Sequence, residues 1–331
     1  MAERISIVSR PDVQAQLPSI AIGLSRVGVR GVEKVIRIRH EGAEQLFSAQ
    51  IECFVDLGPD QKGAHMSRFE EVVNEAIGEV ILGESGFRAE QLAQRIAELV
   101  RSRQRALRAE VTIAARYPEH RLAPVSGIKT QEIYTLFGIA VASERGTRRV
   151  VGVAAQGMTA CPCAQQLVAA DARERLEDGG FGAEEIERIF EAVPVATHNQ
   201  RGLGTLHVGV PEGEALEIEA RTLLAIVENA MSSEIYELMK RSDEAAVVTR
   251  AHARPRFVED CVREMIGGVV GELPELTDAA FVSARQQNLE TIHQHDVEAE
   301  RQGTLGELRR ELSGGGGHSP AHTTMRAWLD G

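Results

Sequence analysis

Three stretches in the second half of the chain concentrate side chains that can do chemistry. They are the Cys-Pro-Cys of residues 161–163 with residues 198–201, the charged residues 240–244 with 257–260, and residues 288–295. Thiolate, imidazole and carboxylate groups are the usual protein ligands of Zn²⁺ and Fe²⁺. A mixed site that keeps one metal position open to water suits catalysis better than scaffolding. The residue types therefore point to a metal-dependent active site.

Each of these groups also has an ordinary structural explanation. A free cysteine is often a small buried hydrophobe, which would account for Cys161 and its neighbour. Glu290 and His293 share a face only in a helix, and in a strand they would point to opposite sides. Glu244 and Glu259 are also explained as solvated carboxylates. Spacing alone leaves both explanations open.

Composition excludes several classes of protein. The chain has 331 residues, of which 43% are apolar, enough to bury a core. Its net charge of −12, with no dense Lys/Arg block, argues against binding to DNA or RNA. No apolar run approaches the roughly 20 residues that cross a bilayer, and the first residues lack the pattern of a secretory signal. We therefore expect a cytoplasmic protein without membrane or nucleic-acid partners.

The absence of well-known motifs narrows the class of enzyme. The four cysteines are too few for a disulfide scaffold, and no second Cys pair completes a structural zinc module. The sequence contains neither a nucleotide phosphate loop, nor a Gly-x-Gly-x-x-Gly fingerprint, nor a Gly-x-Ser-x-Gly elbow. Ordinary NTPases, dinucleotide oxidoreductases and serine hydrolases are therefore disfavoured.

Periodicity predicts the elements that must position these residues. The pattern becomes β-like from Val35, and alternating apolar residues then predict a long strand over 47–57. A helix is expected from Ser67, with Glu70 completing a capping box, and a second one over 89–101. Strands at 109–116 and 132–143 complete the order strand, strand, helix, helix, strand, strand.

The second half is expected to repeat that order with insertions. The strands are predicted at 149–155, 204–210, 246–250 and 280–286, and the helices at 165–177, 183–192 and across 217–240. Pro255 is expected as the first residue of a further helix.

Taken together and in this order, the motifs resemble the type IB GTP cyclohydrolases, including the archaeal branch that feeds methanopterin. The match runs from about Asp12 to Leu308. Its pieces are Asp-Val-Gln at 12–14, Arg-Val-Gly at 26–28, Asp-Leu at 56–57, Lys-Gly-Ala-His-Met-Ser-Arg at 62–68, Gly-Met-Thr-Ala-Cys-Pro-Cys at 157–163, His-Asn-Gln-Arg at 198–201, Lys-Arg-Ser-Asp-Glu at 240–244, Phe-Val-Glu-Asp at 257–260 and Glu-Thr-Ile-His-Gln-His at 290–295.

The resemblance implies an α+β tunnelling fold (T-fold) with antiparallel sheets and helices on one face. Each subunit would hold two strand-strand-helix-helix-strand-strand modules, at 12–146 and 147–312, between a flexible N-terminus (1–11) and a flexible tail (313–331). It also implies a homotetramer with active sites at the interfaces between subunits.

The resemblance also implies roles for individual residues. Cys161, His198 and Glu244 would hold one divalent metal ion, Fe²⁺, Zn²⁺ or Mn²⁺, with no organic cofactor. Cys161, Cys163, Glu290 and His293 would act in catalysis close to the metal. Glu259 would anchor the purine, because a carboxylate can accept both the N1–H and the exocyclic amine of guanine. The implied phosphate contacts, supplied partly by a neighbouring subunit, are Lys62, His65, Arg68 and Arg201.

The implied reaction is hydrolysis of GTP at C8, with loss of formate and closure to a dihydropterin. Asn199 follows the bacterial pattern, which favours 7,8-dihydroneopterin triphosphate and a first step of folate synthesis. The long connection between Cys163 and His198 and the ending at His295 follow the archaeal branch. Members of that branch can release the 2′,3′-cyclic phosphate, which is the alternative product.

Three other interpretations remain. A nitrile reductase of the same fold would use a nucleophilic cysteine and NADPH, but it leaves His198 and Glu244 without a role. A non-catalytic purine-binding protein would need no metal and release no formate. A structural zinc module fits least, because the Cys pair is single.

Overall fold

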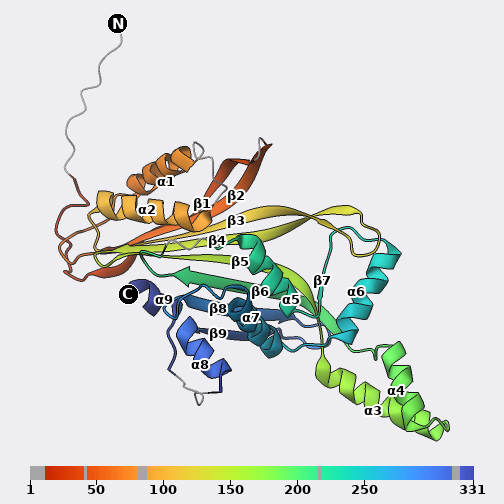
Figure 1. The fold of residues 1–331 in the computed structure, drawn as a ribbon. Helices are drawn as coiled ribbons and strands as arrows, with labels where there is room; N and C mark the ends of the chain where they lie inside the picture. The colour runs from red at the N-terminus through yellow and green to blue at the C-terminus, as the bar shows by residue number, and fades with distance from the viewer. Residues whose placement is uncertain (1–11, 41–42, 81–87, 215–217, 315–320) are drawn as a thin grey trace. The chain divides into compact units, whose positions relative to one another are not determined.

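The computed structural model describes residues 12–40, 43–80, 88–214, 218–314 and 321–331, so the N-terminal segment 1–11 lies outside the described residues. The strands are β1 (Leu24–His40), β2 (Ala43–Leu57), β3 (Ala109–Leu122), β4 (Lys129–Ser143), β5 (Gly146–Ala160), β6 (Asn199–Val210), β7 (Ser233–Glu234), β8 (Phe281–Leu289) and β9 (Val297–Thr304). The helices are α1 (Met66–Val80), α2 (Ala89–Gln104), α3 (Pro162–Asp178), α4 (Ala183–Ala192), α5 (Ala220–Ala230), α6 (Arg241–Ala253), α7 (Val258–Glu272), α8 (Leu305–Leu312) and α9 (Met325–Asp330) (Figure 1).

The described strands form one nine-stranded sheet in the order β1-β2-β3-β4-β5-β6-β8-β9, with β7 paired to β5 beside this path. Residue contacts divide the chain into two compact units. Unit 1 holds residues 1–114, 138–149 and 330–331, and unit 2 holds residues 115–137 and 150–329. The pairs β1–β2, β5–β7, β6–β8 and β8–β9 are antiparallel.

In unit 1 the alternation of apolar residues along β2 buries one face of the strand. Phe47, Ala49, Ile51 and Cys53 are all at most 2% exposed. β1 lies so close to β2 at Gly28 that a Cβ there would sit 1.9 Å from the Cys53 carbonyl oxygen, so only glycine fits. The two helices of this unit, α1 and α2, pack against each other and contact β1 and β2 respectively.

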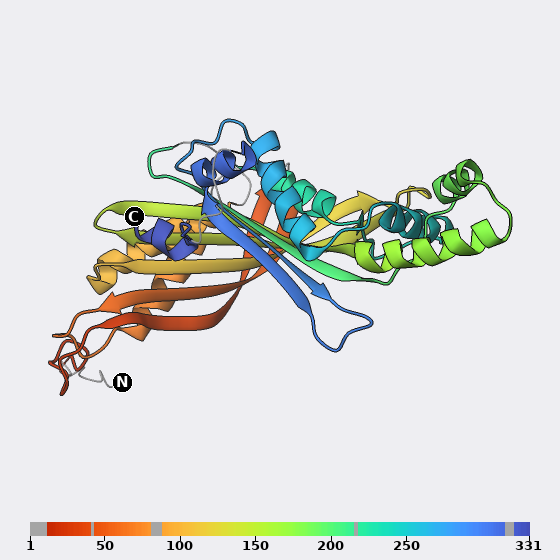
Figure 2. The same ribbon diagram turned by 90° about the horizontal axis from the view of Figure 1, so that it is seen from below.

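In unit 2 two helices cover β6 and β8. Figures 1 and 2 show α5 and α7 on the same face of these strands, and the two helices also contact each other. The inward stripe of α7 is Val258, Cys261, Val262, Met265 and Ile266, and all five side chains are buried. The helix layer contacts β6, β8 and β9, and the candidate site lies at the end of β5, the start of β6 and the end of β8.

The expected tunnelling fold of two repeated modules is wrong. The structure shows one nine-stranded sheet, in which β5 begins at Gly146, the place where the modules were to meet. Between β5 and β9 the chain runs α3, α4, β6, α5, β7, α6, α7 and β8, which does not repeat the first-half order. Apolar alternation identifies strands but carries no information about which strands share a sheet, and that is why the module count failed.

Several element predictions also change. Residues 246–250 lie within helix α6 and not in a strand, because Asp243, Val247 and Ala251 are buried at four-residue spacing. Helix α1 already begins at Met66, so Ser67 is not its cap. Helix α7 begins at Val258 rather than at Pro255.

The end of the chain carries structure that the sequence did not predict. β9 and α8 follow β8, and α9 lies within the segment 313–331 that was expected to be a flexible tail. Trp328 is buried, and its indole Nε1 donates a hydrogen bond to the Ala279 carbonyl at 2.9 Å. Among the described residues, no helix is both long and apolar enough to cross a membrane.

Candidate functional site

Cys161 lies between β5 and α3 and caps the first turn of that helix. Pro162 occupies the first helical position, where a missing N–H costs nothing. The Cys161 sulfur accepts a hydrogen bond from the Ala164 backbone N–H at 3.5 Å. Its backbone N–H donates to the His198 carbonyl at 3.1 Å, and the Thr197 hydroxyl donates to its carbonyl at 2.8 Å. The cysteine and the histidine predicted as metal ligands are therefore joined through their backbones.

The His198 ring lies among polar side chains at the start of β6. Its Nδ1 lies 3.1 Å from Gln200 Oε1 and 3.7 Å from Glu290 Oε2. The side chains of His198 and Glu290 are 13% and 6% exposed. Burial of a carboxylate beside an imidazole keeps both groups in fixed positions and strengthens their electrostatic interaction.

Two further histidines follow β8 in exposed positions. The His293 ring meets the His198 ring edge-on at 6.3 Å and stacks on His295 at 5.3 Å. Thr291, in the same segment, donates its hydroxyl proton to the Asn199 carbonyl at 3.0 Å, which ties the segment to β6. The loop after β8 therefore brings His293 beside His198, as the motif predicted.

One cavity of about 230 Å³ collects five of the eleven predicted residues. Its lining includes Cys161, His198, Glu259, Glu290 and His293. Glu259 reaches it from the first turn of α7, where the helix dipole favours a negative charge. The cavity thus combines a thiol, imidazoles and carboxylates, which can bind a cation and transfer protons.

The side chains of the smaller cavity have donor types that suit a metal ion, but they are not arranged as a complete ligand set. The buried Glu290 Oε2 has no hydrogen-bond partner among the described residues, as expected of an atom whose partner is a bound ligand. Thiol, imidazole and carboxylate are also the right donor types for Fe²⁺ or Zn²⁺. The described residues contain no group of three such side chains already arranged to hold an ion. Two predicted residues, Glu244 on α6 and Cys163 on α3, are exposed and do not line the cavity.

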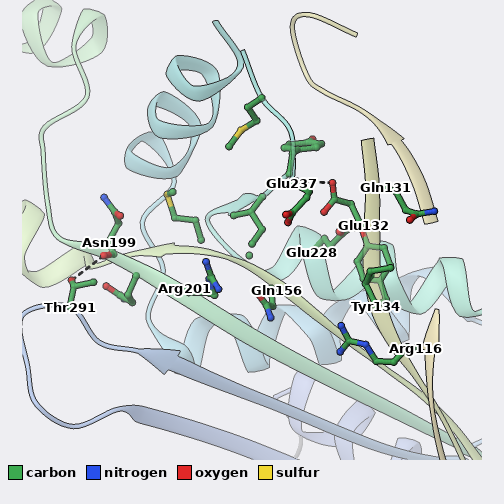
Figure 3. A pocket seen from close by; sticks show the side chains of 17 residues that line it. Arg116, Gln131, Glu132, Tyr134, Gln156, Asn199, Arg201, Glu228, Glu237 and Thr291 are labelled. Atoms are coloured by element: carbon green, nitrogen blue, oxygen red, sulfur yellow. Dashed lines mark hydrogen bonds between the residues drawn. The ribbon is translucent and has the colours of Figure 1, made fainter. Parts of the chain in front are cut away.

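A larger cavity of about 760 Å³ lies beside the first, and Gln200 lines both. In Figure 3 its side chains come from β3 to β6, from α5 and from the segment after β7. Arg201, one of the predicted phosphate contacts, lines it together with Arg116. Neither guanidinium has a hydrogen bond or ion pair within the described part of the chain, so both are available to an anion.

A buried polar cluster forms part of this larger cavity. The Glu228 carboxylate accepts a hydrogen bond from the Tyr134 hydroxyl at 2.8 Å and pairs with Arg121. Burial raises the pKa of Glu228, although Arg121 and Tyr134 oppose the shift. These three residues carried no signal in the sequence, because each stands alone among unrelated neighbours.

The other predicted phosphate contacts lie in unit 1, Lys62 and His65 between β2 and α1 and Arg68 in the first turn of α1. His65 Nε2 lies 3.1 Å from Asp12 Oδ2, and Arg68 donates to the Arg103 carbonyl at 3.1 Å. Lys62 is exposed, with a backbone hydrogen bond to the Gln16 carbonyl. None of the three lines either of the cavities described above.

Sequence reasoning missed the polar residues that support the site. Gln200 is 5% exposed, and its amide Nε2 donates to Thr159 Oγ1 at 3.0 Å. Asp243 is buried and accepts four hydrogen bonds, from the N–H groups of Val125, Ser126 and Lys240 and from the Ser126 hydroxyl. Both residues stand inside the family motifs, so the motif itself was the available signal.

Known proteins agree with the motif resemblance. GTP cyclohydrolase MptA of Methanococcus maripaludis is 42% identical over 308 residues, covering 91% of this chain and 97% of the relative. GTP cyclohydrolase MptA of Methanosarcina mazei is 41% identical over 313 residues, covering 92% and 97%. Among solved structures, a hyper-thermostable mutant of AgUricase has a TM-score of 0.50 at 9% identity, covering 87% of this chain and 94% of that chain. A likeness at that identity concerns the fold alone.

The match to a family model gives the chain a more specific family than the motifs did. The model that matches residues 11–299 describes type I GTP cyclohydrolase folE2, and this description takes the place of the type IB label that the motifs suggested. The matched range contains every predicted metal, catalytic and substrate residue. The chain belongs to the type I GTP cyclohydrolase folE2 family.

Proposed function

We propose that this protein is a GTP cyclohydrolase that opens the guanine ring at C8 and releases formate. The observation that carries the proposal is the cavity that gathers Cys161, His198, Glu259, Glu290 and His293 from four separate segments. Membership in the folE2 family and the relatives named GTP cyclohydrolase MptA support the same reaction.

Each residue of the site has its own role in the proposed reaction. Glu259 accepts hydrogen bonds from the guanine N1–H and exocyclic amine, which orients C8 within the cavity. His293 protonates a ring nitrogen, and the unpartnered Glu290 oxygen accepts a proton. Cys161 and His198 hold the divalent metal, with Glu244 as the third ligand that the family motif assigns. A bound Fe²⁺, Zn²⁺ or Mn²⁺ ion supplies a water of lowered pKa.

The proposed product is the one associated with the archaeal branch. The MptA relatives come from methanogens of the genera Methanococcus and Methanosarcina. Helices α3 and α4 fill the long connection between Cys163 and His198, which is the feature shared with that branch. These observations favour 7,8-dihydroneopterin 2′,3′-cyclic phosphate over the triphosphate that Asn199 suggested.

The proposed assembly is a homotetramer whose active sites combine two subunits. Lys62, His65 and Arg68 line neither cavity of unit 2, so they are candidates for phosphate contacts delivered to a neighbouring copy. Glu244 is exposed in the single chain and would complete its site on assembly or on metal binding.

The deciding experiment is an anaerobic assay of metal-stripped protein with GTP. Zn²⁺, Fe²⁺ and Mn²⁺ are restored in turn, and formate and pterin are both identified by mass. Metal-dependent formate is expected, and the pterin mass distinguishes the cyclic phosphate from the triphosphate. No formate with any metal, from folded protein, would leave a non-catalytic purine-binding protein or a nitrile reductase as the remaining interpretations.

A substitution tests the role of the thiol. Cys161→Ala should abolish formate release while the melting temperature of the metal-free protein stays near that of the wild type, since the Cys161 sulfur accepts only one backbone hydrogen bond. Cys53→Ala is the control, because Cys53 is fully buried in unit 1 and should affect stability but not turnover. Near-normal turnover in Cys161→Ala would contradict the assignment.

A further inference from the structure

The His198 ring has two possible partners for a proton on Nδ1. Gln200 Oε1 lies 3.1 Å away, within hydrogen-bond distance, whereas Glu290 Oε2 lies 3.7 Å away and beyond it. The nearby Glu290 carboxylate still favours the tautomer that carries its proton on the facing nitrogen. The proton on Nδ1 is then donated to Gln200, and Nε2 keeps its lone pair.

Gln200 is held in the orientation that this hydrogen bond requires. Its Nε2 donates to Thr159 Oγ1 at 3.0 Å, so its Oε1 faces His198. Gln200 is 5% exposed and Thr159 is fully buried, so water cannot readily replace either contact. The two residues sit on β6 and β5, which are neighbours in the sheet.

We propose that Gln200 is a positioning residue that, with Thr159, holds His198 as the Nδ1–H tautomer. The proposal deepens the proposed function and rests on it only in assigning His198 to the metal. It explains why Glu290 Oε2 remains without a partner inside the cavity, and it leaves the lone pair of His198 Nε2 free for a metal ion. Partners of this kind set the tautomer and ring orientation of metal-binding histidines.

The assignment of the proton decides what Glu290 can do. If Glu290 accepted the Nδ1 proton, its Oε2 would be occupied by the histidine. Because Gln200 accepts that proton instead, the carboxylate stays available to the ligand of the cavity. Gln200 therefore lets His198 and Glu290 have different roles, although His198 Nδ1 lies only 3.7 Å from Glu290 Oε2.

The tautomer can be measured directly in metal-free protein by ¹⁵N NMR of labelled histidine, with the His198 signals identified by a His198→Gln variant. Wild type and Glu290→Ala should show Nδ1–H, because Gln200 is present in both. Gln200→Glu should also keep Nδ1–H, since it retains an acceptor oxygen. The double variant Gln200→Leu/Glu290→Ala should gain the Nε2–H form.

Either of two results would overturn the proposal: Nε2–H in the wild type, or an unchanged His198 spectrum in the double variant. The comparison of Glu290→Ala with the double variant isolates Gln200, because the two differ only there. None of these measurements uses GTP, so they succeed or fail independently of cyclohydrolase activity.

Metal affinity provides a second measurement. Gln200→Leu should bind Zn²⁺ about 10- to 100-fold more weakly in chelator competition, the usual effect of removing such a partner. Gln287→Leu is the matched control, since Gln287 on β8 makes only a 3.5 Å contact with Asp296 and lines neither cavity. Equal Zn²⁺ affinity in both variants, at similar melting temperatures, would refute the positioning role.

Discussion

His207 is a half-buried histidine on β6 that takes no part in the candidate site. Its ring packs against Phe137 at 5.2 Å, and a Cβ at Gly152 would lie only 2.3 Å from it. Burial lowers its pKa from 6.5 to about 4, because the charged imidazolium is poorly solvated there. The side chain is therefore neutral in the folded protein at physiological pH.

This residue should make stability depend on pH. Since its pKa is lower in the folded than in the unfolded chain, the unfolded state binds more protons between pH 6.5 and about 4. The free energy of unfolding should fall as the pH falls through this window, by on the order of 3 kcal/mol in total. Denaturant unfolding of wild type and His207→Phe at several pH values measures it. Parallel pH dependences of the two proteins would show that His207 is not responsible.

Arg201 lines the larger cavity without a partner among the described residues and is expected to bind phosphate. Arg201→Ala should raise KM for GTP by roughly 10- to 100-fold with a smaller change in kcat, as for loss of a charge-assisted hydrogen bond. Arg263→Ala is the control, because Arg263 is exposed on α7 and pairs with Asp260. A KM equal to that of the control would place the phosphates elsewhere.

At the scale of residues, the motifs predicted several side chains that share the smaller cavity. They did not predict which residue of a helix faces the protein interior. Cys161, His198, Glu259 and Glu290 meet as expected. Glu244 does not, because Asp243 is the buried member of that adjacent pair and neighbouring helical residues point in different directions. Gln200 was missed since a neutral amide has no place in a search for ligands and proton donors.

At the scale of elements, Asp243 fixes the N-terminus of α6 to the connection between β3 and β4. Although burial opposes ionisation, hydrogen bonds from Ser126, Lys240 and Val125 hold the pKa of Asp243 well below its ordinary value. A carboxyl with a depressed folded pKa stabilises the fold above its ordinary pKa, and this contribution is lost as the pH falls through the folded value.

Asp243→Ala should therefore lower the melting temperature clearly at neutral pH, since it removes the buried acceptor of four hydrogen bonds. Calorimetry of this variant beside Asp178→Ala, an exposed aspartate at the end of α3, gives the comparison. Equal melting temperatures would mean that α6 does not depend on this anchor.

The elements themselves were predictable where burial follows one clear period. β2 and α2 were found from alternation and from a helical stripe. The segment 246–250 was misassigned because its apolar residues also fit a two-residue period, and only the buried four-residue spacing in α6 distinguishes the two. Figures 1 and 2 show α3 and α4 extending beyond the ends of β5 and β6, and α3 has no buried residue, so no stripe marks its packing.

At the scale of the whole molecule, a shared active site can be tested by mixing inactive subunits. Cys161→Ala should be inactive, and Lys62→Ala should have little activity at GTP concentrations below its raised KM. Co-expressed chains should regain activity at these concentrations, because about a quarter of randomly assembled sites hold neither substitution. Light scattering of the mixture checks the size of the assembly. Activity that stays at the level of the separate variants would indicate sites built within one subunit.

The sequence could not predict how many sheets and compact units the chain forms. Strand patterns report burial of each strand face, but the pairing of β6 with β8 and of β5 with β7 depends on contacts distant in sequence. The family motifs predicted function better than architecture, since they record chemistry residue by residue.

Trp328 in α9 is the only tryptophan of the chain, and its ring lies 5.7 Å from that of Phe281. Its burial makes it a built-in fluorophore for the docking of the last helix onto unit 2. Release of α9 would expose the indole to water and shift its emission to longer wavelength. An affinity tag fused after Gly331 can thus be judged by the colour of the protein's own fluorescence before any activity is assayed.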